Sequence, residues 1–134
     1  MKGQDVVYAN LSGAMKRQAE CIVEAMHAAR LKRLIFISSM GIYGEVPGET
    51  YRNTLDPYRD SGKVIESSEL DYTILRPAWL NNRDEIDYGT TQKGETFKNA
   101  TAVVSRKSIA DLVIKLATTP GLESRRSLGV HKGS

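Results

Sequence analysis

The chain has 134 residues, 40% of them hydrophobic, and carries a formal net charge of +3. That length predicts one domain over residues 1–134, with room for a real hydrophobic core. No run approaches the roughly 20 apolar residues that span a membrane, and residues 1–5 lack the apolar stretch of a signal peptide. We therefore expect a cytoplasmic protein with no membrane partner.

Charge distribution and cysteine content disfavour two further classes. The basic residues are scattered and form no run interleaved with aromatic residues, which argues against nucleic acid as a partner. Cys21 is the only cysteine, so an internal disulfide and a cysteine-based metal site are excluded. Cys21 falls within a helical pattern, where we expect a half-buried side chain. We predict no metal centre.

The chain opens with a strand pattern followed by a helix pattern. The β-branched run from Asp5 to Asn10 ends in small and polar residues, as expected of a strand that feeds a loop. Ser12 suits an N-cap, and apolar residues then recur at helical spacing through about Arg30.

An unbroken apolar run from Leu34 to Ile37 predicts a central parallel strand, buried on both faces. Ser38 and Ser39 follow it directly. Ligands of open α/β sheets bind at the carboxyl ends of the strands, so both serines are functional candidates. Serines at a strand end also satisfy backbone groups in ordinary turns, and the residues alone leave both interpretations open.

A second helix and a third strand follow. Asp56 suits the N-cap of this helix and Pro57 its first helical position. The apolar run from Tyr72 to Leu75 then predicts a buried strand, which Arg76 and Pro77 should end because proline stops ladder pairing. Residues beyond Pro77 would lie at the same rim as the two serines.

The last third of the chain gives weaker patterns. We expect an irregular hairpin that pairs residues 86–88 with residues 102–104. Ser105 then caps a final helix, and residues 127–131 predict a short strand.

The order strand, helix, strand, helix, strand, with nearly continuous apolar strands, predicts an α/β fold. Its sheet should be parallel with right-handed crossovers. The carboxyl ends of the three strands then meet at one edge of the sheet, where a ligand site is expected.

Three separated segments carry a family resemblance. Residues 36–44, Phe-Ile-Ser-Ser-Met-Gly-Ile-Tyr-Gly, look like the fifth-strand signature of extended and atypical short-chain dehydrogenases/reductases. Residues 63–80 resemble the lysine helix and sixth strand of the NmrA-like, NAD(P)H-binding branch, and residues 103–112 resemble its closing segment. The resemblance covers nearly the whole chain.

This resemblance implies a Rossmann-type domain that binds NAD or NADP. The glycine-rich turn that holds the pyrophosphate in the family is absent, and no strand precedes Asp5. The chain therefore resembles the carboxyl-terminal half of such a domain, a partial Rossmann-like fold, with residues 6–8 matching the family's fourth strand. We expect weak or absent dinucleotide binding by this chain alone.

The resemblance also assigns roles to individual residues. Ala9 and Asn10 would lie beside the adenine-side ribose, and Ser38 and Ser39 beside the nicotinamide ribose and substrate. Ser39 matches the catalytic serine, which polarises a substrate carbonyl. Lys63 would be the catalytic lysine and would hold the nicotinamide ribose. The carboxamide would be contacted by Pro77, Ala78 and Trp79.

One catalytic position departs from the family. Reductases of the family place a tyrosine four residues before the lysine, and here that position is Arg59. Tyr58 is one residue off, about 100° around the helix, and should not substitute. Read from spacing alone, Arg59, Lys63 and Glu66 share one helical face, and a solvent-exposed ion pair is the preferred interpretation.

Three functions remain open. The first is an NAD(P)H-dependent oxidoreductase that transfers hydride to a flavin, a quinone or a small carbonyl. The second is a non-catalytic NAD(P)-binding redox sensor or regulator, and the third is a fragment without activity of its own. The strand at residues 6–8 would be an unpaired apolar edge, which predicts a homo-oligomer or coverage by an upstream segment.

Overall fold

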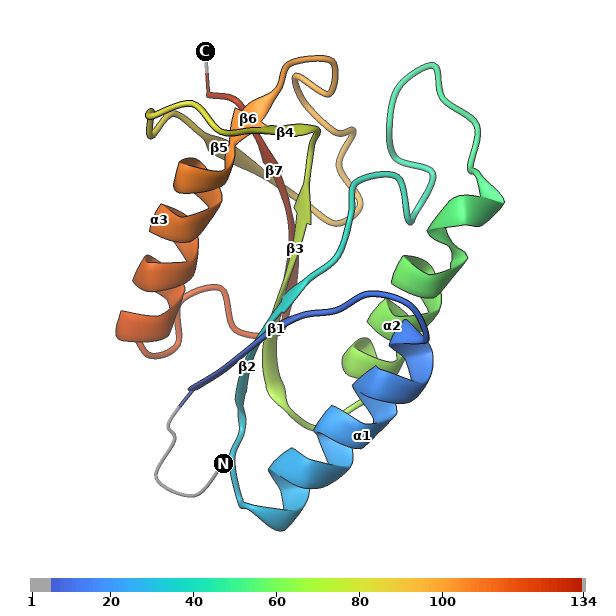
Figure 1. Cartoon of the computed structure of the whole chain (residues 1–134), viewed down its shortest axis with the longest axis vertical. Helices are drawn as coiled ribbons and strands as arrows, with labels where there is room; N and C mark the ends of the chain where they lie inside the picture. Colours follow the sequence, from blue (N-terminus) through green and yellow to red (C-terminus); the bar gives the residue numbers. More distant parts are fainter. Residues whose placement is uncertain (1–5, 134) are drawn as a thin grey trace.

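The computed structural model describes residues 6–133, which form a sheet covered by helices on both faces (Figure 1). In spatial order the strands are β1 (Val6–Asn10), β2 (Arg33–Ile37), β3 (Asp71–Pro77), β7 (Arg126–His131) and β5 (Gly89–Gln92). The helices are α1 (Met15–Ala28), α2 (Asp56–Glu66) and α3 (Arg106–Thr118), with a short 3-10 helix, η1 (Asn53–Leu55), before α2. A separate small sheet pairs β4 (Leu80–Asn81) with β6 (Val104–Ser105).

The sheet confirms the predicted α/β fold. β1, β2, β3 and β7 run parallel, and β5 pairs antiparallel with β7 at one edge. In the register, Asn10 is the partner of Ile37, and Ile37 is the partner of Leu75. The three predicted strands are therefore adjacent and end at the same rim.

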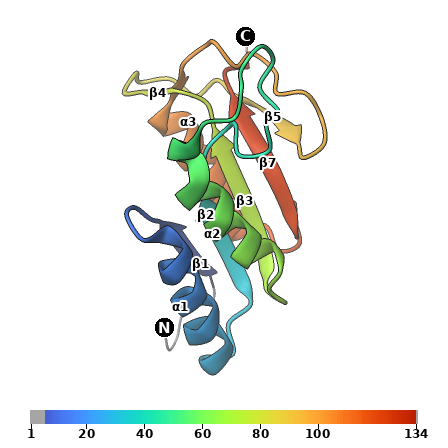
Figure 2. The ribbon, with the colours of Figure 1, turned by 90° about the vertical axis from the view of Figure 1, so that its right-hand side faces the viewer.

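The buried side chains of β2 explain the two helical layers, which Figures 1 and 2 show on opposite faces of the sheet. Ile35 and Ile37 pack in one apolar cluster with α3, while Leu34 and Phe36 pack in another with α1 and α2. All four side chains are at most 8% exposed. A strand that must fill two cores has no polar face, which is why this stretch reads as continuously apolar.

The predicted N-cap of the first helix is wrong by two residues. α1 begins at Met15 with Ala14 at the N-cap, and no side chain caps it. Gly13 has a φ of +76°, a left-handed conformation that separates Ser12 from the helix. Cys21 on this helix is exposed, contrary to the half-buried position expected.

The second helix also starts differently. Asp56 is its first helical residue and Leu55 is the N-cap, because η1 runs directly into α2. Pro57 does lie in the first turn, as predicted. The carboxylate of Asp56 does not cap the helix; it accepts a hydrogen bond from the Tyr51 hydroxyl.

The predicted hairpin is wrong. Residues 86–88 are not a strand, and the short strands in this region instead pair with other partners: β5 with β7, and β6 with β4. The predicted tail strand is confirmed as β7, and it lies inside the sheet between β3 and β5. Strand pairing in this region therefore depends on partners that lie far away in the sequence.

Pro77 does not stop the third strand where expected. β3 continues through Arg76 and Pro77, which pair with Gly129 and Val130 of β7. β2 has already ended at Ile37, opposite Leu75, so the missing N–H of Pro77 leaves no gap on that side.

No helix within residues 6–133 is long and apolar enough to cross a membrane. In the same part of the chain, no three histidine, cysteine, aspartate or glutamate side chains lie close enough together to hold a metal ion.

Candidate functional site

A cavity of about 380 Å³ opens at the carboxyl ends of β2 and β3. Its walls come from the segment after β2, the loop and η1 before α2, the first turns of α2, the residues after β3, and the start of α3. Five of the predicted site residues line it: Ser38, Ser39, Pro77, Ala78 and Trp79. The rim predicted from the sequence is therefore a real hollow.

The two serines sit at the floor of this cavity. The Ser38 N–H donates to the Leu75 carbonyl at 2.7 Å, which continues the β2–β3 pairing by one residue. The Ser38 side chain is 4% exposed in total, and its hydroxyl has no hydrogen-bond partner within the described residues. Ser39 donates its hydroxyl proton to the Met40 carbonyl at 3.0 Å. A buried hydroxyl without a partner is costly, so Ser38 would gain a hydrogen bond by turning its hydroxyl toward a ligand in the cavity.

The segment after β3 forms the opposite wall. The Ala78 N–H donates to the Val130 carbonyl at 2.9 Å, and the Trp79 carbonyl accepts from the Val104 N–H at 2.8 Å. Pairing of β4 with β6 therefore holds this wall against the start of α3. The Trp79 side chain is 65% exposed at the mouth.

Tyr51, which lines the cavity, contacts Asp56 and Arg59 in the first turn of α2. The Tyr51 hydroxyl donates to Asp56 Oδ1 at 2.5 Å, and the Arg59 guanidinium lies 5.1 Å from the centre of the Tyr51 ring. Desolvation, together with the hydrogen bond to Asp56, raises the pKa of Tyr51 above 10.0. This hydroxyl therefore stays protonated near neutral pH and cannot act there as a base.

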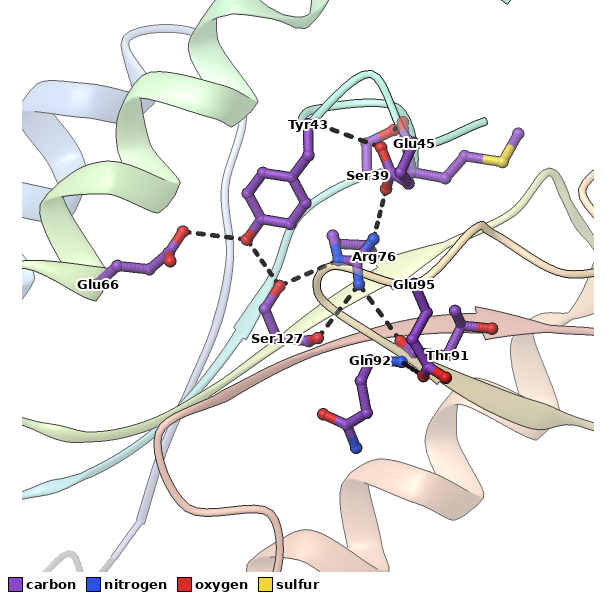
Figure 3. Close-up of polar contacts among 10 residues, drawn as sticks. Ser39, Tyr43, Glu45, Glu66, Arg76, Thr91, Gln92, Glu95 and Ser127 are labelled. Atoms are coloured by element: carbon purple, nitrogen blue, oxygen red, sulfur yellow. Dashed lines mark hydrogen bonds and ion pairs between the residues drawn. The ribbon is translucent and has the colours of Figure 1, made fainter. Parts of the chain in front are cut away.

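A buried ionic network anchors the loop that follows β2 (Figure 3). The Arg76 side chain is 0% exposed and pairs with the Glu45 carboxylate. It also donates to the Ser127 hydroxyl at 3.0 Å, to the Ser127 carbonyl at 3.1 Å and to the Thr91 carbonyl at 3.3 Å. The other Glu45 oxygen accepts from the Tyr43 N–H at 3.2 Å. The loop is thus tied to β3, β5 and β7.

Tyr43 extends this network to α2. Its hydroxyl lies 3.0 Å from Glu66 Oε1 and 2.8 Å from the Ser127 hydroxyl. A carboxylate can only accept a hydrogen bond, so the Tyr43 hydroxyl donates to Glu66 and accepts a hydrogen bond from the Ser127 hydroxyl. Burial is the main reason that the pKa of Tyr43 lies well above its ordinary value. Glu66 also pairs with Lys93 at 2.5 Å, and not with Lys63.

Ala9 and Asn10 end β1 at the same rim but do not line the cavity. Ala9 is 5% exposed, whereas Asn10 is exposed. They stand one strand away from the serines, since Asn10 is the register partner of Ile37.

Lys63 is the predicted residue that the structure places elsewhere. It is exposed and lines a shallow depression between α1 and α2, together with Lys16 and His27. Tyr58, which the spacing excluded, lines the cavity. The two residues are five positions apart, which separates them by about 140° around the helix. Helical phase thus places Lys63 outside the cavity, and its contact with the nicotinamide ribose stays a prediction.

Comparison with known proteins decides the family. A family model described as NAD(P)H-binding matches residues 1–120. The chain belongs to this NAD(P)H-binding family. Family membership makes a nicotinamide dinucleotide the class of cofactor to consider at the rim. The NmrA-like assignment remains a prediction.

Individual relatives agree with the NAD(P)H-binding family. The chain is 30% identical over 120 residues to a Bacillus subtilis (strain 168) protein named "Uncharacterized sugar epimerase YhfK", covering 87% of this chain and 50% of that protein. A Rossmann-fold NAD(P)-binding family protein from Shigella flexneri is 42% identical with a TM-score of 0.83, covering 98% of this chain and 61% of its own.

A short-chain dehydrogenase/reductase from Veillonella parvula DSM 2008, solved in complex with NADP, is 26% identical with a TM-score of 0.84, covering 97% of this chain and 64% of its own. The chain therefore spans about half the length of the curated relative and less than two thirds of these structures.

The sequence analysis did not identify several residues that line or support the cavity. Tyr51, Arg52 and Tyr58 line the cavity, as does Arg106. The polar loop at residues 45–54 was a visible signal, because long polar loops between strand and helix are often functional. Glu45 and Arg76 gave a second signal, because a charged residue inside an apolar strand needs a buried partner.

Proposed function

We propose that this chain holds the nicotinamide end of NAD or NADP in the cavity at the ends of β2 and β3, as part of an oxidoreductase. The observation that carries the proposal is the buried Ser38 hydroxyl, which lacks a partner among residues 6–133 and lies on a cavity of about 380 Å³. Ser38 would bind the ribose, and Pro77, Ala78 and Trp79 would flank the carboxamide.

The nicotinamide ring supplies hydride when the dinucleotide is bound. Ser39 would polarise a substrate oxygen, for which its hydroxyl must turn away from the Met40 carbonyl that it now contacts. Tyr58 would place a second hydroxyl on the cavity. Its O–H makes no hydrogen bond within the described residues, so it is free to donate to a substrate. A flavin, a quinone or a small carbonyl would be the acceptor.

A non-catalytic NAD(P) sensor is the alternative. The observation that favours it is the position of Lys63, which lines the separate depression between α1 and α2. A site without the family's lysine could hold the cofactor and still lack the charge that assists proton transfer from a tyrosine.

Fluorescence of Trp79, the only tryptophan, tests cofactor binding by the full chain, because the residue lines the cavity. Energy transfer to NADPH or NADH reports occupancy. Ser38→Ala should weaken binding about fivefold to tenfold, the effect of losing one hydrogen bond of roughly 1–1.5 kcal/mol. The exposed Ser67→Ala is the matched control and should leave the affinity unchanged.

Lys63→Ala separates the two placements of the lysine. Unchanged affinity agrees with its position outside the cavity, and a tenfold loss would restore the role that the family resemblance implied. Turnover is then assayed with flavin, quinone and small-carbonyl acceptors. Binding without turnover supports the sensor, whereas dinucleotide binding that Ser38→Ala does not weaken contradicts the proposed site.

A further inference from the structure

Two arginines stand at the cavity from different parts of the chain. Arg52 lies in the loop just before η1, and Arg106 is the first residue of α3. Both side chains are exposed, so they stand at the mouth rather than at the floor. Neither residue has a role in the nicotinamide contacts proposed above.

Neither guanidinium forms an ion pair with a carboxylate of the described residues. Within residues 6–133 the Arg52 side chain forms no hydrogen bond or ion pair, and Arg106 bonds only the Asn82 amide oxygen, through Nη1 at 2.8 Å. By contrast, Arg33, Arg59 and Arg76 each pair with an acid. A guanidinium has five N–H donors, so both residues at the mouth have donors to spare.

The charge of the mouth is positive even after its one carboxylate is counted. Glu49 also lines the cavity but lies within ion-pair distance of neither arginine in the described structure. Arg106 stands in the first turn of α3, which holds no acidic residue. The positive end of the helix dipole therefore adds to the charge of the arginine at this point.

Aromatic residues line the same cavity as the serines and the arginines. Tyr51, Tyr58 and Trp79 line the same cavity, and Trp79 keeps 65% of its side chain exposed. An exposed tryptophan beside a hollow offers a flat apolar face to a ligand. Rings with guanidinium groups at their edge suit a molecule with a flat body and an anionic end.

We propose that the substrate of this site is a flat, unsaturated or aromatic organic acid. Its ring would lie against the tyrosines and the exposed face of Trp79 that the carboxamide leaves free, and its anionic group would accept hydrogen bonds from Arg52 and Arg106. The proposal rests on the oxidoreductase function above, because it assigns the part of the cavity that the nicotinamide end would leave free. It adds a substrate class to that function.

Trp79 fluorescence also tests this inference, now with benzoate as the probe and without dinucleotide. Benzoate should quench the full chain saturably, at a concentration at least about tenfold lower than its neutral analogue benzamide. Arg52→Gln and Arg106→Gln should each weaken benzoate binding about threefold to tenfold and leave benzamide unaffected. Arg17→Gln on α1, an exposed arginine that does not line the cavity, is the control with the same change in net charge.

Three results would overturn the inference. They are equal affinity for benzoate and benzamide, a loss of benzoate affinity in Arg17→Gln as large as in the cavity variants, or unchanged benzoate affinity in both cavity variants. Inorganic phosphate is the remaining probe in this binding experiment. If it binds as well as benzoate, the mouth selects an anion and the flat body is wrong. NADPH binding is measured separately. The preference for an anionic ligand can therefore be refuted while the cofactor site is supported, and the cofactor site can be refuted while that preference is supported.

Discussion

Arg76 is a buried cation that the fold satisfies almost completely. Its guanidinium contacts the Glu45 carboxylate, two groups of Ser127 and the Thr91 carbonyl, and it lies 4.9 Å from the centre of the Tyr43 ring. Removing a charge from water costs several kcal/mol unless each donor finds an acceptor. These acceptors come from two strands, β5 and β7, and from one loop, so Arg76 ties the cavity loop to the sheet.

Loss of Arg76 should therefore destabilise the protein strongly. We expect Arg76→Met to lower the free energy of unfolding by about 3–5 kcal/mol, because it leaves the Glu45 carboxylate buried without its partner. Urea denaturation of the full chain measures this change. The double variant Arg76→Met/Glu45→Gln should cost less than the sum of its single changes, since no unpaired charge remains.

The control for this prediction is an exposed pair. Arg83 is 73% exposed and lies 4.0 Å from Glu85, so Arg83→Met should change stability by less than about 0.5 kcal/mol. Equal costs at Arg76 and Arg83 would contradict the buried-network interpretation.

Tyr43 should make stability depend on alkaline pH. Burial raises its pKa above 10.0 in the folded protein, so the folded state holds the phenolic proton more tightly than the unfolded chain. The stabilisation is complete below about pH 10 and is lost as the pH rises above that value. Denaturation between about pH 8 and about pH 11 should show a shallower loss for Tyr43→Phe than for the wild type. Parallel curves would show that the hydroxyl titrates alike in both states.

At the scale of the element, the start of α3 positions one side of the site. Ser105 Oγ accepts from the Ser108 N–H at 3.0 Å and donates to the Glu85 carbonyl at 2.6 Å. The same residue ends β6, which pairs with β4 beside Trp79. One serine thus caps the helix and links it to the wall of the cavity.

The two serines predicted as N-caps form a matched test. Ser105→Ala should lower the free energy of unfolding by about 1–2 kcal/mol, because the cap and a buried hydrogen bond are lost. Ser12→Ala should have almost no effect, because Ala14 holds the N-cap of α1. Chemical denaturation measures both variants. A cost for Ser12→Ala as large as that for Ser105→Ala would place the start of α1 nearer to Ser12.

At the scale of the whole molecule, β1 is an open edge. Within residues 6–133 it pairs only with β2. Val6 and Val7 are half-buried, and Tyr8 keeps 49% of its surface exposed. An unpaired edge that carries apolar side chains is a template for another strand.

We therefore predict that the 134-residue chain self-associates through β1. Sedimentation should show concentration-dependent dimers or larger species. Tyr8→Lys should weaken association about tenfold or more, because a charged edge residue opposes pairing. Ile114→Lys, which alters a 62% exposed side chain on α3, should leave association unchanged. A stable wild-type monomer with β1 uncovered would contradict this prediction.

The sequence predicted the sheet because its signals are local. Four consecutive apolar residues from Leu34 to Ile37 suit only a strand covered on both sides, and the serines that follow mark its polar end. The hairpin at residues 86–88 failed because β5 takes β7 as its partner, and no local pattern identifies a partner so far along the chain. Short strands without strong alternation depend on the sheet that accepts them.

The sequence by itself determined the α/β class, the three central strands and the rim at which Ser38, Ser39 and Ala78 meet. The tertiary structure decided that Tyr58 faces the cavity and Lys63 does not. It also joined Arg76 to Glu45, 31 positions earlier in the chain. Helical spacing fixes which residues share a face, but the docking of the helix on the sheet decides where that face points. That docking depends on contacts that are distant in the sequence.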